Sequence, residues 1–158
     1  QSAMAKNMAS AGRIGQGRGL VALDGAGQAG IILRRLEALG ELERACIVAR
    51  YTDRTSECPC CHQSTASEQY RDAINKLADW AASTIGHITE VPRLRYAIIQ
   101  EFYERRRSVG KLADAMGMAR STAYDQRARI WPKLDMLDKK ALGEMDEQLL
   151  ELVNPAIA

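Results

Sequence analysis

Four soft metal ligands lie within five consecutive residues near the middle of the chain. Residues 58–62 are Cys-Pro-Cys-Cys-His, and Cys58 and Cys61 have the C-x-x-C spacing of half a zinc site. A closed structural zinc site needs four ligands in a tetrahedral arrangement, and no second C-x-x-C pair follows. We expect that Cys60, Cys61 and His62 do not converge easily on one ion, because they are adjacent in the chain.

The candidate metal ligands are Cys58, Cys60 and Cys61, and two alternatives stay open. The loop either binds Zn²⁺ or stays reduced without a metal, and only Cys46 and His87 remain as distant ligands. Three crowded cysteines do not resemble a disulfide framework. A catalytic Cys/His pair lacks a supporting acid, and the chain has two histidines and no paired-carboxylate motif. The sequence therefore predicts that the protein is not an enzyme.

A glycine-rich stretch at residues 25–30, GAGQAG, matches the G-x-G-x-x-G fingerprint of dinucleotide-binding sites. It follows GLVAL, a candidate strand, and precedes a predicted helix. The acid that would bind the ribose, Asp53, lies too far along the chain, and no further β-α-β units follow. We therefore interpret these glycines as a flexible approach to the first helix.

Residues 108–133 have the residue types of a helix-turn-helix, which is the most informative pattern in the chain. Ala113 is small where two helices would cross closely, and Gly117 falls where the turn needs a positive φ. Met118 would lie under the turn. The second helix of such a motif lies in the DNA major groove, with its N-terminal residues at the base edges. The pattern predicts a protein that reads double-stranded DNA.

The charge distribution supports this prediction. The net charge is only +2, but residues 93–133 hold ten Lys/Arg against four Asp/Glu. Residues 134–158 hold two against six. A basic block that coincides with the motif is expected of a phosphate-binding surface. The alternative is a solvated basic face without a partner.

The motif assigns roles to particular side chains. We expect the residues nearest the groove to be Arg120, Ser121, Thr122, Tyr124 and Asp125. Arg120 could donate two hydrogen bonds to guanine, and Tyr124 stays open between base contact and packing. We expect phosphate contacts from Arg127, Arg129, Lys111, Arg105, Arg106 and Arg107.

The elements that must position these residues are predicted to be helices. Leu, Ile, Ala and Met supply the apolar content and there is one Phe, which favours helices over strands. Helical periodicity covers residues 28–39, 41–51, 68–85, 92–106 and 139–153, besides the motif itself. We expect an all-α, multi-helix domain that ends in a helix-turn-helix. Without a membrane-spanning run or a signal-peptide pattern, we expect a cytoplasmic protein.

The chain is predicted to have four parts. Residues 1–27 form a flexible basic tail, and residues 28–91 form a helical part with a cysteine-rich loop at 52–67. Residues 92–137 hold the helix-turn-helix, and residues 138–158 form an acidic amphipathic helix. This last helix either packs back onto the motif, forms a homo-oligomer or contacts another protein.

Residues 93–134 resemble the region-4-type domain of bacterial sigma factors, in which a helix precedes the helix-turn-helix with the same spacing. The larger arrangement is similar to phage late-gene antitermination proteins of the lambdoid Q type. There a helix, the phrase ARYT (here Ala49 to Thr52), a cysteine-rich loop and an AI-x-x-LA helix (here Ala73 to Ala78) precede the sigma-like module. The resemblance covers roughly residues 30–137.

The resemblance implies a function in the bacterial host cell. Such antiterminators bind a DNA element in the late promoter, engage a paused RNA polymerase holoenzyme and let it read through terminators. Two departures from the family pattern concern the second helix of the motif. Ala119 stands at the position of the usual Ser/Thr cap, so Ser121 could cap a helix that starts later, and Gln126 replaces an apolar residue. The alternatives are a dimeric helix-turn-helix repressor or activator, and a sigma-mimicking polymerase adaptor.

Overall fold

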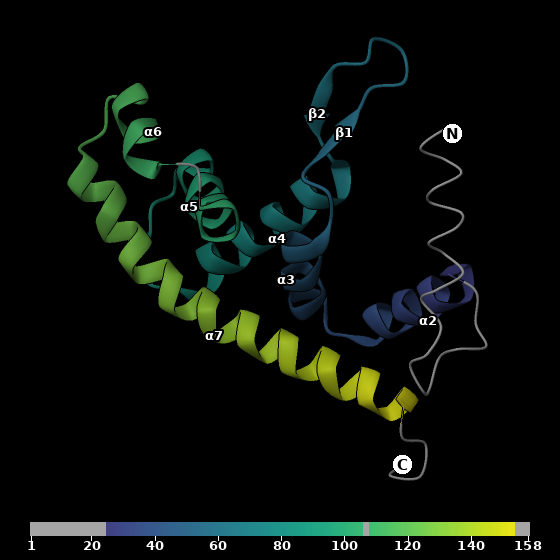
Figure 1. Cartoon of the computed structure of the whole chain (residues 1–158). Helices are drawn as coiled ribbons and strands as arrows, with labels where there is room; N and C mark the ends of the chain where they lie inside the picture. The colour runs from purple at the N-terminus through teal and green to yellow at the C-terminus, as the bar shows by residue number, and fades with distance from the viewer. Residues whose placement is uncertain (1–24, 106–107, 154–158) are drawn as a thin grey trace. The chain divides into compact units, whose positions relative to one another are not determined.

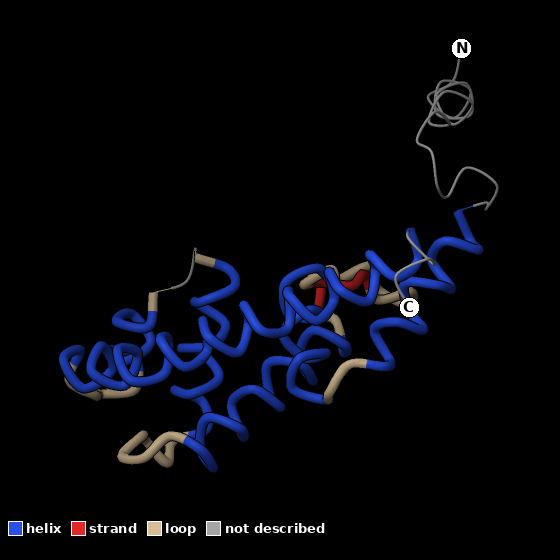
Figure 2. The backbone as a smooth tube through the Cα atoms, turned by 90° about the horizontal axis from the view of Figure 1, so that it is seen from below, coloured by secondary structure: helices blue, strands red, loops and turns tan. Residues whose placement is uncertain are grey.

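The computed structural model describes residues 25–105 and 108–153, and these are mostly helical (Figure 2). The all-α class predicted from the sequence is confirmed, with two short strands added. Most of the predicted basic tail, and the candidate phosphate contacts Arg106 and Arg107, lie outside the described residues.

Six helices and one hairpin make up the described chain (Figure 1). The helices are α2 (Gly25–Ala38), α3 (Glu41–Tyr51), α4 (Glu68–Thr84), α5 (Pro92–Glu104), α6 (Val109–Ala115) and α7 (Arg120–Val153). The strands β1 (Thr55–Glu57) and β2 (Ser64–Ala66) pair antiparallel. The predicted loop at 52–67 therefore contains a β-hairpin of two short strands.

The chain divides into two compact units, which we describe separately. The larger unit runs from Leu39 to Glu144, and the smaller one combines the described residues before it with those after it. Helix α7 runs without a break through residue 138, where the sequence-based division places a boundary.

The core of the larger unit forms where α3 packs on α4, α4 on α5 and α5 on α6. Helix α4 shows why these residues fold in this way, since its buried positions recur with helical spacing on one face. They are Tyr70, Ala73, Ile74, Leu77, Ala78 and Ala81. The helix begins at a Ser67 cap, whose hydroxyl accepts a hydrogen bond from the Tyr70 N–H at 3.3 Å.

Helix α7 is a single helix of 34 residues, although the sequence predicted a motif helix and a separate C-terminal helix. Pro132 lies inside it, and proline normally breaks a helix because it lacks an N–H. Buried Ile130 and Leu134 on either side hold the helix against the core. Two ion pairs to α3 fasten its middle, Arg50 with Asp138 and Glu43 with Lys140. Tertiary packing therefore overrides the local signal for a break.

The smaller unit pairs α2 with the last turns of α7. The Arg35 guanidinium donates to Gln148 Oε1 at 3.1 Å and lies 3.4 Å from Glu151 Oε2. The glycines at 25–30 belong to α2, so the interpretation of this stretch as a flexible approach is wrong. Within the described part of the chain, no helix is long and apolar enough to cross a membrane.

Candidate functional site

The turn between α6 and α7 is closed by backbone hydrogen bonds. Gly117 has φ +68°, the positive value that the sequence predicted. The Met118 N–H donates to the Ala113 carbonyl at 2.8 Å, and the Gly117 N–H donates to the Asp114 carbonyl at 3.1 Å. This pair of bonds is a Schellman motif, which ends a helix and reverses the chain direction. The turn therefore fixes the direction in which the chain passes from α6 into α7.

The Tyr124 side chain of α7 lies against α6 at Gly110. Ala113 and Ala123 are fully buried, and a Cβ at Gly110 would lie 2.6 Å from the Tyr124 hydroxyl. A larger side chain at position 110 would therefore displace the phenol of Tyr124. Tyr124 still exposes 39% of its surface. Tyr124 thus lies against Gly110 and is partly exposed, which fits both roles that the sequence left open, packing and base contact.

The first two turns of α7 present a polar face. Ser121, Thr122 and Asp125 are exposed beside Arg120, and Ala123 faces the core. The helix begins at Arg120, so a later start capped by Ser121 is wrong. The candidate base-reading residues thus share the N-terminal end of one helix.

Arg120 is paired with Asp114 across the turn. Its Nε–H donates to both carboxylate oxygens, at 2.7 and 2.9 Å, and its Nη2 donates to Asp114 Oδ2. Both side chains are exposed, at 63% for Arg120 and 46% for Asp114. The hydrogen bonds from Arg120 lower the pKa of the Asp114 carboxyl below its ordinary value.

The candidate phosphate contacts occupy different environments. Lys111 and Arg129 are exposed, on α6 and α7 respectively. Arg105 is exposed at the end of α5, where it takes a left-handed conformation with φ 51°. Arg127 is half-buried and lies 4.7 Å from the Tyr124 ring centroid and 4.8 Å from that of Trp131. Its guanidinium stacks on aromatic rings, which makes it less available than the other three.

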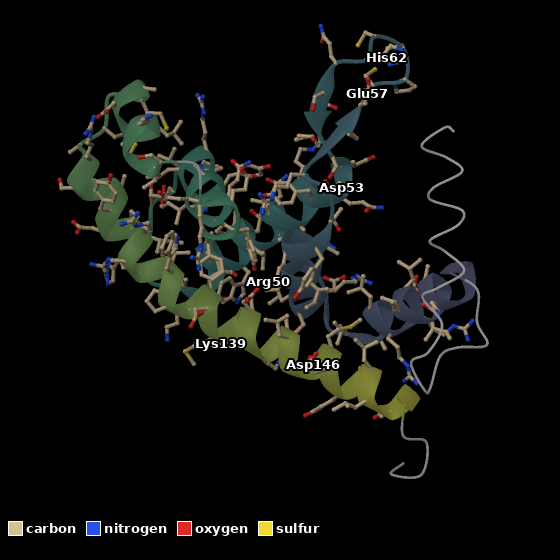
Figure 3. All side chains as sticks on the ribbon, viewed as in Figure 1. Arg50, Asp53, Glu57, His62, Lys139 and Asp146 are labelled. Carbon is tan, nitrogen blue, oxygen red and sulfur yellow. The ribbon has the colours of Figure 1, made fainter. Side chains whose placement is uncertain are left out.

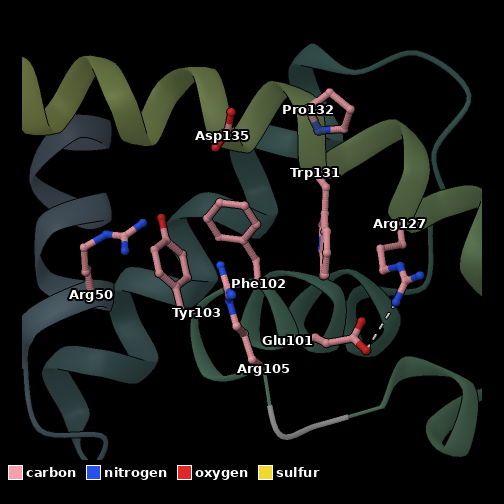
Figure 4. Close-up of a pocket in the computed structure, with 9 residues that line it drawn as sticks. All are labelled: Arg50, Glu101, Phe102, Tyr103, Arg105, Arg127, Trp131, Pro132 and Asp135. Atoms are coloured by element: carbon pink, nitrogen blue, oxygen red, sulfur yellow. Dashed lines mark hydrogen bonds and ion pairs between the residues drawn. The ribbon is translucent and has the colours of Figure 1, made fainter.

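An open cavity of about 750 Å³ lies between the end of α5, the middle of α7 and Arg50 of α3 (Figure 4). Three arginines line it. Arg50 is held by Asp138, and Arg127 lies 3.5 Å from Glu101 Oε1. Among the described residues, Arg105 is the one of the three without an ion-pair partner. The cavity therefore offers one accessible cation beside aromatic walls, which is consistent with a phosphate contact by Arg105.

Gln126 fastens α7 to the segment before α5. Its Oε1 accepts a hydrogen bond from the Thr89 N–H at 2.6 Å, and its Nε2 donates to the His87 carbonyl at 3.4 Å. An apolar residue at this position could not satisfy these groups. This role was not visible in the sequence, because the partners lie 37 and 39 residues away.

The hairpin β1–β2 carries the cysteines at its tip. The Cys58 N–H donates to the Gln63 carbonyl at 2.9 Å, and the His62 N–H donates to the Cys58 carbonyl at 2.9 Å. The side chain of His62 lies 3.2 Å from Glu57, at the far end of the hairpin (Figure 3). The backbone bonds fold the tip into a tight turn that brings neighbouring side chains together.

Three thiols meet at this tip and could hold a metal ion. The sulfur atoms of Cys58, Cys60 and Cys61 all lie within 4.8 Å of one another. The thiols of Cys60 and Cys61 thus lie closer together than the expectation for Cys60, Cys61 and His62 allowed. Within the described residues, neither His62 nor His87 belongs to this group.

The pKa of a thiol differs between the hairpin tip and the core. Hydrogen bonds from the Cys60 thiol, and from the N–H groups of Cys60 and Cys61, lower the pKa of Cys58 to about 7. A thiolate is the form that binds metals. Burial in α3 raises the pKa of Cys46 to about 12, and within the described residues Cys46 does not belong to the thiol group at the tip.

Comparison with known protein families, curated proteins and solved structures finds no match for this chain. The function therefore has to be inferred from the polar start of α7 and from the thiol cluster.

Proposed function

We propose that this protein is a transcription factor that binds double-stranded DNA in a sequence-specific manner. The observation that supports the proposal is the exposed polar face at the start of α7, beyond the tight turn after α6. A helix presented in this way can enter the major groove with its N-terminal side chains at the base edges. The exposed cations Lys111, Arg129 and Arg105 would contact the phosphates around it.

The most specific form of the proposal is a phage antiterminator. It binds late-promoter DNA in the bacterial cytoplasm and loads onto RNA polymerase, which then reads through terminators. This form rests on the resemblance of residues 93–134 to sigma region 4 and of residues 30–137 to the lambdoid Q type. The order of α5, the short α6 and α7 agrees with that resemblance.

DNA binding is tested first. Incubation of the full chain with a pool of random duplexes, followed by sequencing of the bound fraction, should enrich one site. A palindromic site would favour a dimeric repressor or activator, and an asymmetric site would favour the antiterminator. Transcription across a terminator, from a template that carries the enriched site, should then show more read-through with the protein than without it.

Arg120 tests the geometry of binding. Arg120→Ala should weaken binding to the enriched site about tenfold or more, because a bidentate guanine contact contributes roughly 1–3 kcal/mol. Binding to random duplex should fall much less. Arg71→Ala, at an exposed position on α4, is the matched control and should change neither affinity. An equal loss by Arg120→Ala on both duplexes would rule out base reading by this residue.

A second candidate function is favoured by the ion pairing of the arginines. Arg120 is held by Asp114, and Arg127 is held by aromatic rings and Glu101. A polymerase adaptor that makes little DNA contact would leave these contacts undisturbed. Unchanged terminator read-through by the Arg120→Ala protein would support the adaptor.

We also propose that the hairpin tip binds a zinc ion. Three thiols within 4.8 Å of one another supply the soft ligands that zinc prefers, and a group outside the cluster would complete the tetrahedron. Bound zinc would hold the short hairpin in one conformation. The protein as purified should then contain about one zinc per chain.

Metal analysis by mass spectrometry checks this stoichiometry. Cys58→Ser should lose the zinc, and Cys46→Ala, at a buried position in α3, should retain it. Titration with Co²⁺ provides a second reading, since thiolate ligands give an intense near-ultraviolet charge-transfer band. Zinc-free protein without a Co²⁺–thiolate band would contradict a metal site at the tip.

A further inference from the structure

Asp114 is an acidic residue within the basic segment at 93–133, and it forms an ion pair with Arg120, the proposed base-reading residue. Asp114 lies in the last turn of α6, six residues before Arg120, and only the Gly117 turn separates them. In the DNA complex this carboxylate would lie close to a polyanion. A negative charge near the C-terminal end of a helix is also unfavourable for the helix dipole. An exposed ion pair adds little to stability, so fold stability alone does not account for Asp114.

The geometry of the pair leaves one edge of Arg120 available. A guanidinium has five N–H donors, and Asp114 accepts from the Nε and Nη2 groups along its side. No described residue accepts from Nη1. The two terminal nitrogens can therefore still donate together to the O6 and N7 acceptors of guanine, while Asp114 keeps its hold on the side.

We propose that Asp114 is a positioning residue that sets the specificity of Arg120 for guanine. This inference rests on the proposed function in DNA binding. Asp114 holds the guanidinium in the orientation that a guanine contact needs. It also disfavours binding modes in which Arg120 turns to a backbone phosphate, because the carboxylate would then remain uncompensated beside the DNA. Asp114 thus weakens non-specific binding more than binding to the correct site.

The test compares Asp114→Asn with a control that removes the same charge away from the proposed DNA-contacting residues. Asp79→Asn is that control, because Asp79 is exposed on α4 and has no part in the proposed DNA contact. Each full-length protein is titrated against the duplex enriched by the wild type, against its variants at each base pair, and against random duplex. Titrations at several salt concentrations give the number of phosphates contacted.

Asp114→Asn should bind random duplex more tightly and gain about one phosphate contact in the salt dependence. Its preference for the enriched site should fall about tenfold, with the loss concentrated at one G·C base pair. Asp79→Asn should change binding to both duplexes by the same small factor, because it removes one negative charge without touching the DNA-contacting face. Arg120→Lys should lose the same G·C preference, and adding Asp114→Asn to it should change the preference no further.

The outcomes separate this inference from the proposed function. If the wild-type protein enriches no site, DNA reading itself fails. If it enriches a site and Asp114→Asn shifts both affinities by one factor, as Asp79→Asn does, the positioning role is overturned while DNA reading stands. Thermal unfolding of each variant checks that the fold is intact. Should Asp114→Asn unfold, a retained G·C preference in Arg120→Lys overturns the inference.

Discussion

Single side chains decide how α7 is held and what its first turn presents. Gln126 and Arg120 lie six residues apart on this helix. Gln126 makes hydrogen bonds to residues 37 and 39 positions before it, whereas Arg120 bonds to Asp114, six positions before it. The side chain of Gln126 is half-buried, whereas that of Arg120 is exposed. The first therefore contributes to the fold, and the second is available for a partner.

Replacement of Gln126 by leucine should destabilise the larger unit. The change leaves the N–H of Thr89 without its partner, which costs about 1–3 kcal/mol when such a group is kept from water. Urea unfolding followed by circular dichroism measures the change. Gln69→Leu, at an exposed position on α4, should stay within about 0.5 kcal/mol of the wild type. A Gln126→Leu protein as stable as the wild type would show that the hydrogen bond contributes nothing.

At the scale of elements, backbone conformation decides where glycine is needed. Gly117 in the turn and Gly143 in α7 both have open space where a Cβ would stand. They differ in φ, because Gly117 has the left-handed value of +68° and Gly143 is helical. Alanine at the two positions thus isolates the effect of conformation from that of packing.

The two alanine substitutions should change stability in opposite directions. Gly117→Ala should lower the free energy of unfolding by about 1–2 kcal/mol, because L residues are strained at positive φ. Gly143→Ala should raise it by about 0.5–1 kcal/mol, because alanine favours the helix. Each variant serves as the control for the other in urea unfolding. A loss of stability in both would indicate contacts that the open space does not show.

At the scale of the whole molecule, the two units differ in what they bury. Helix α4 of the larger unit buries six residues, whereas no residue of α2 whose burial is described is buried. Three glycines in α2 weaken that helix further. The units should therefore differ in local stability.

Amide hydrogen exchange should show this difference. The amides of α2 should exchange at least about a hundredfold faster than the central amides of α4, because local opening is easier where little apolar surface is buried. Mass spectrometry of peptides from the two helices provides the comparison within one sample. Equal protection of α2 and α4 would mean that the two units unfold together.

The sequence by itself determined the elements whose signals are local. Apolar residues with helical spacing predicted α3 and α4 within about one residue, Pro92 marked the start of α5, and Gly117 marked the turn. These features depend on backbone conformation and on residues within a few positions of one another. The candidate DNA-contacting residues could be named from the sequence for the same reason, because the motif that assigns their roles is local.

Only the tertiary structure decided the features that depend on distant partners. Helix α7 continues through Pro132 because buried neighbours hold it on both sides, and Gln126 is polar because its partners come from the segment before α5. The thiols of the hairpin converge because strand pairing closes the tip. Gly117 predicted the turn between Asp114 and Arg120, but that these two side chains pair was seen only in the structure, because the pairing depends on the direction in which the chain leaves the turn.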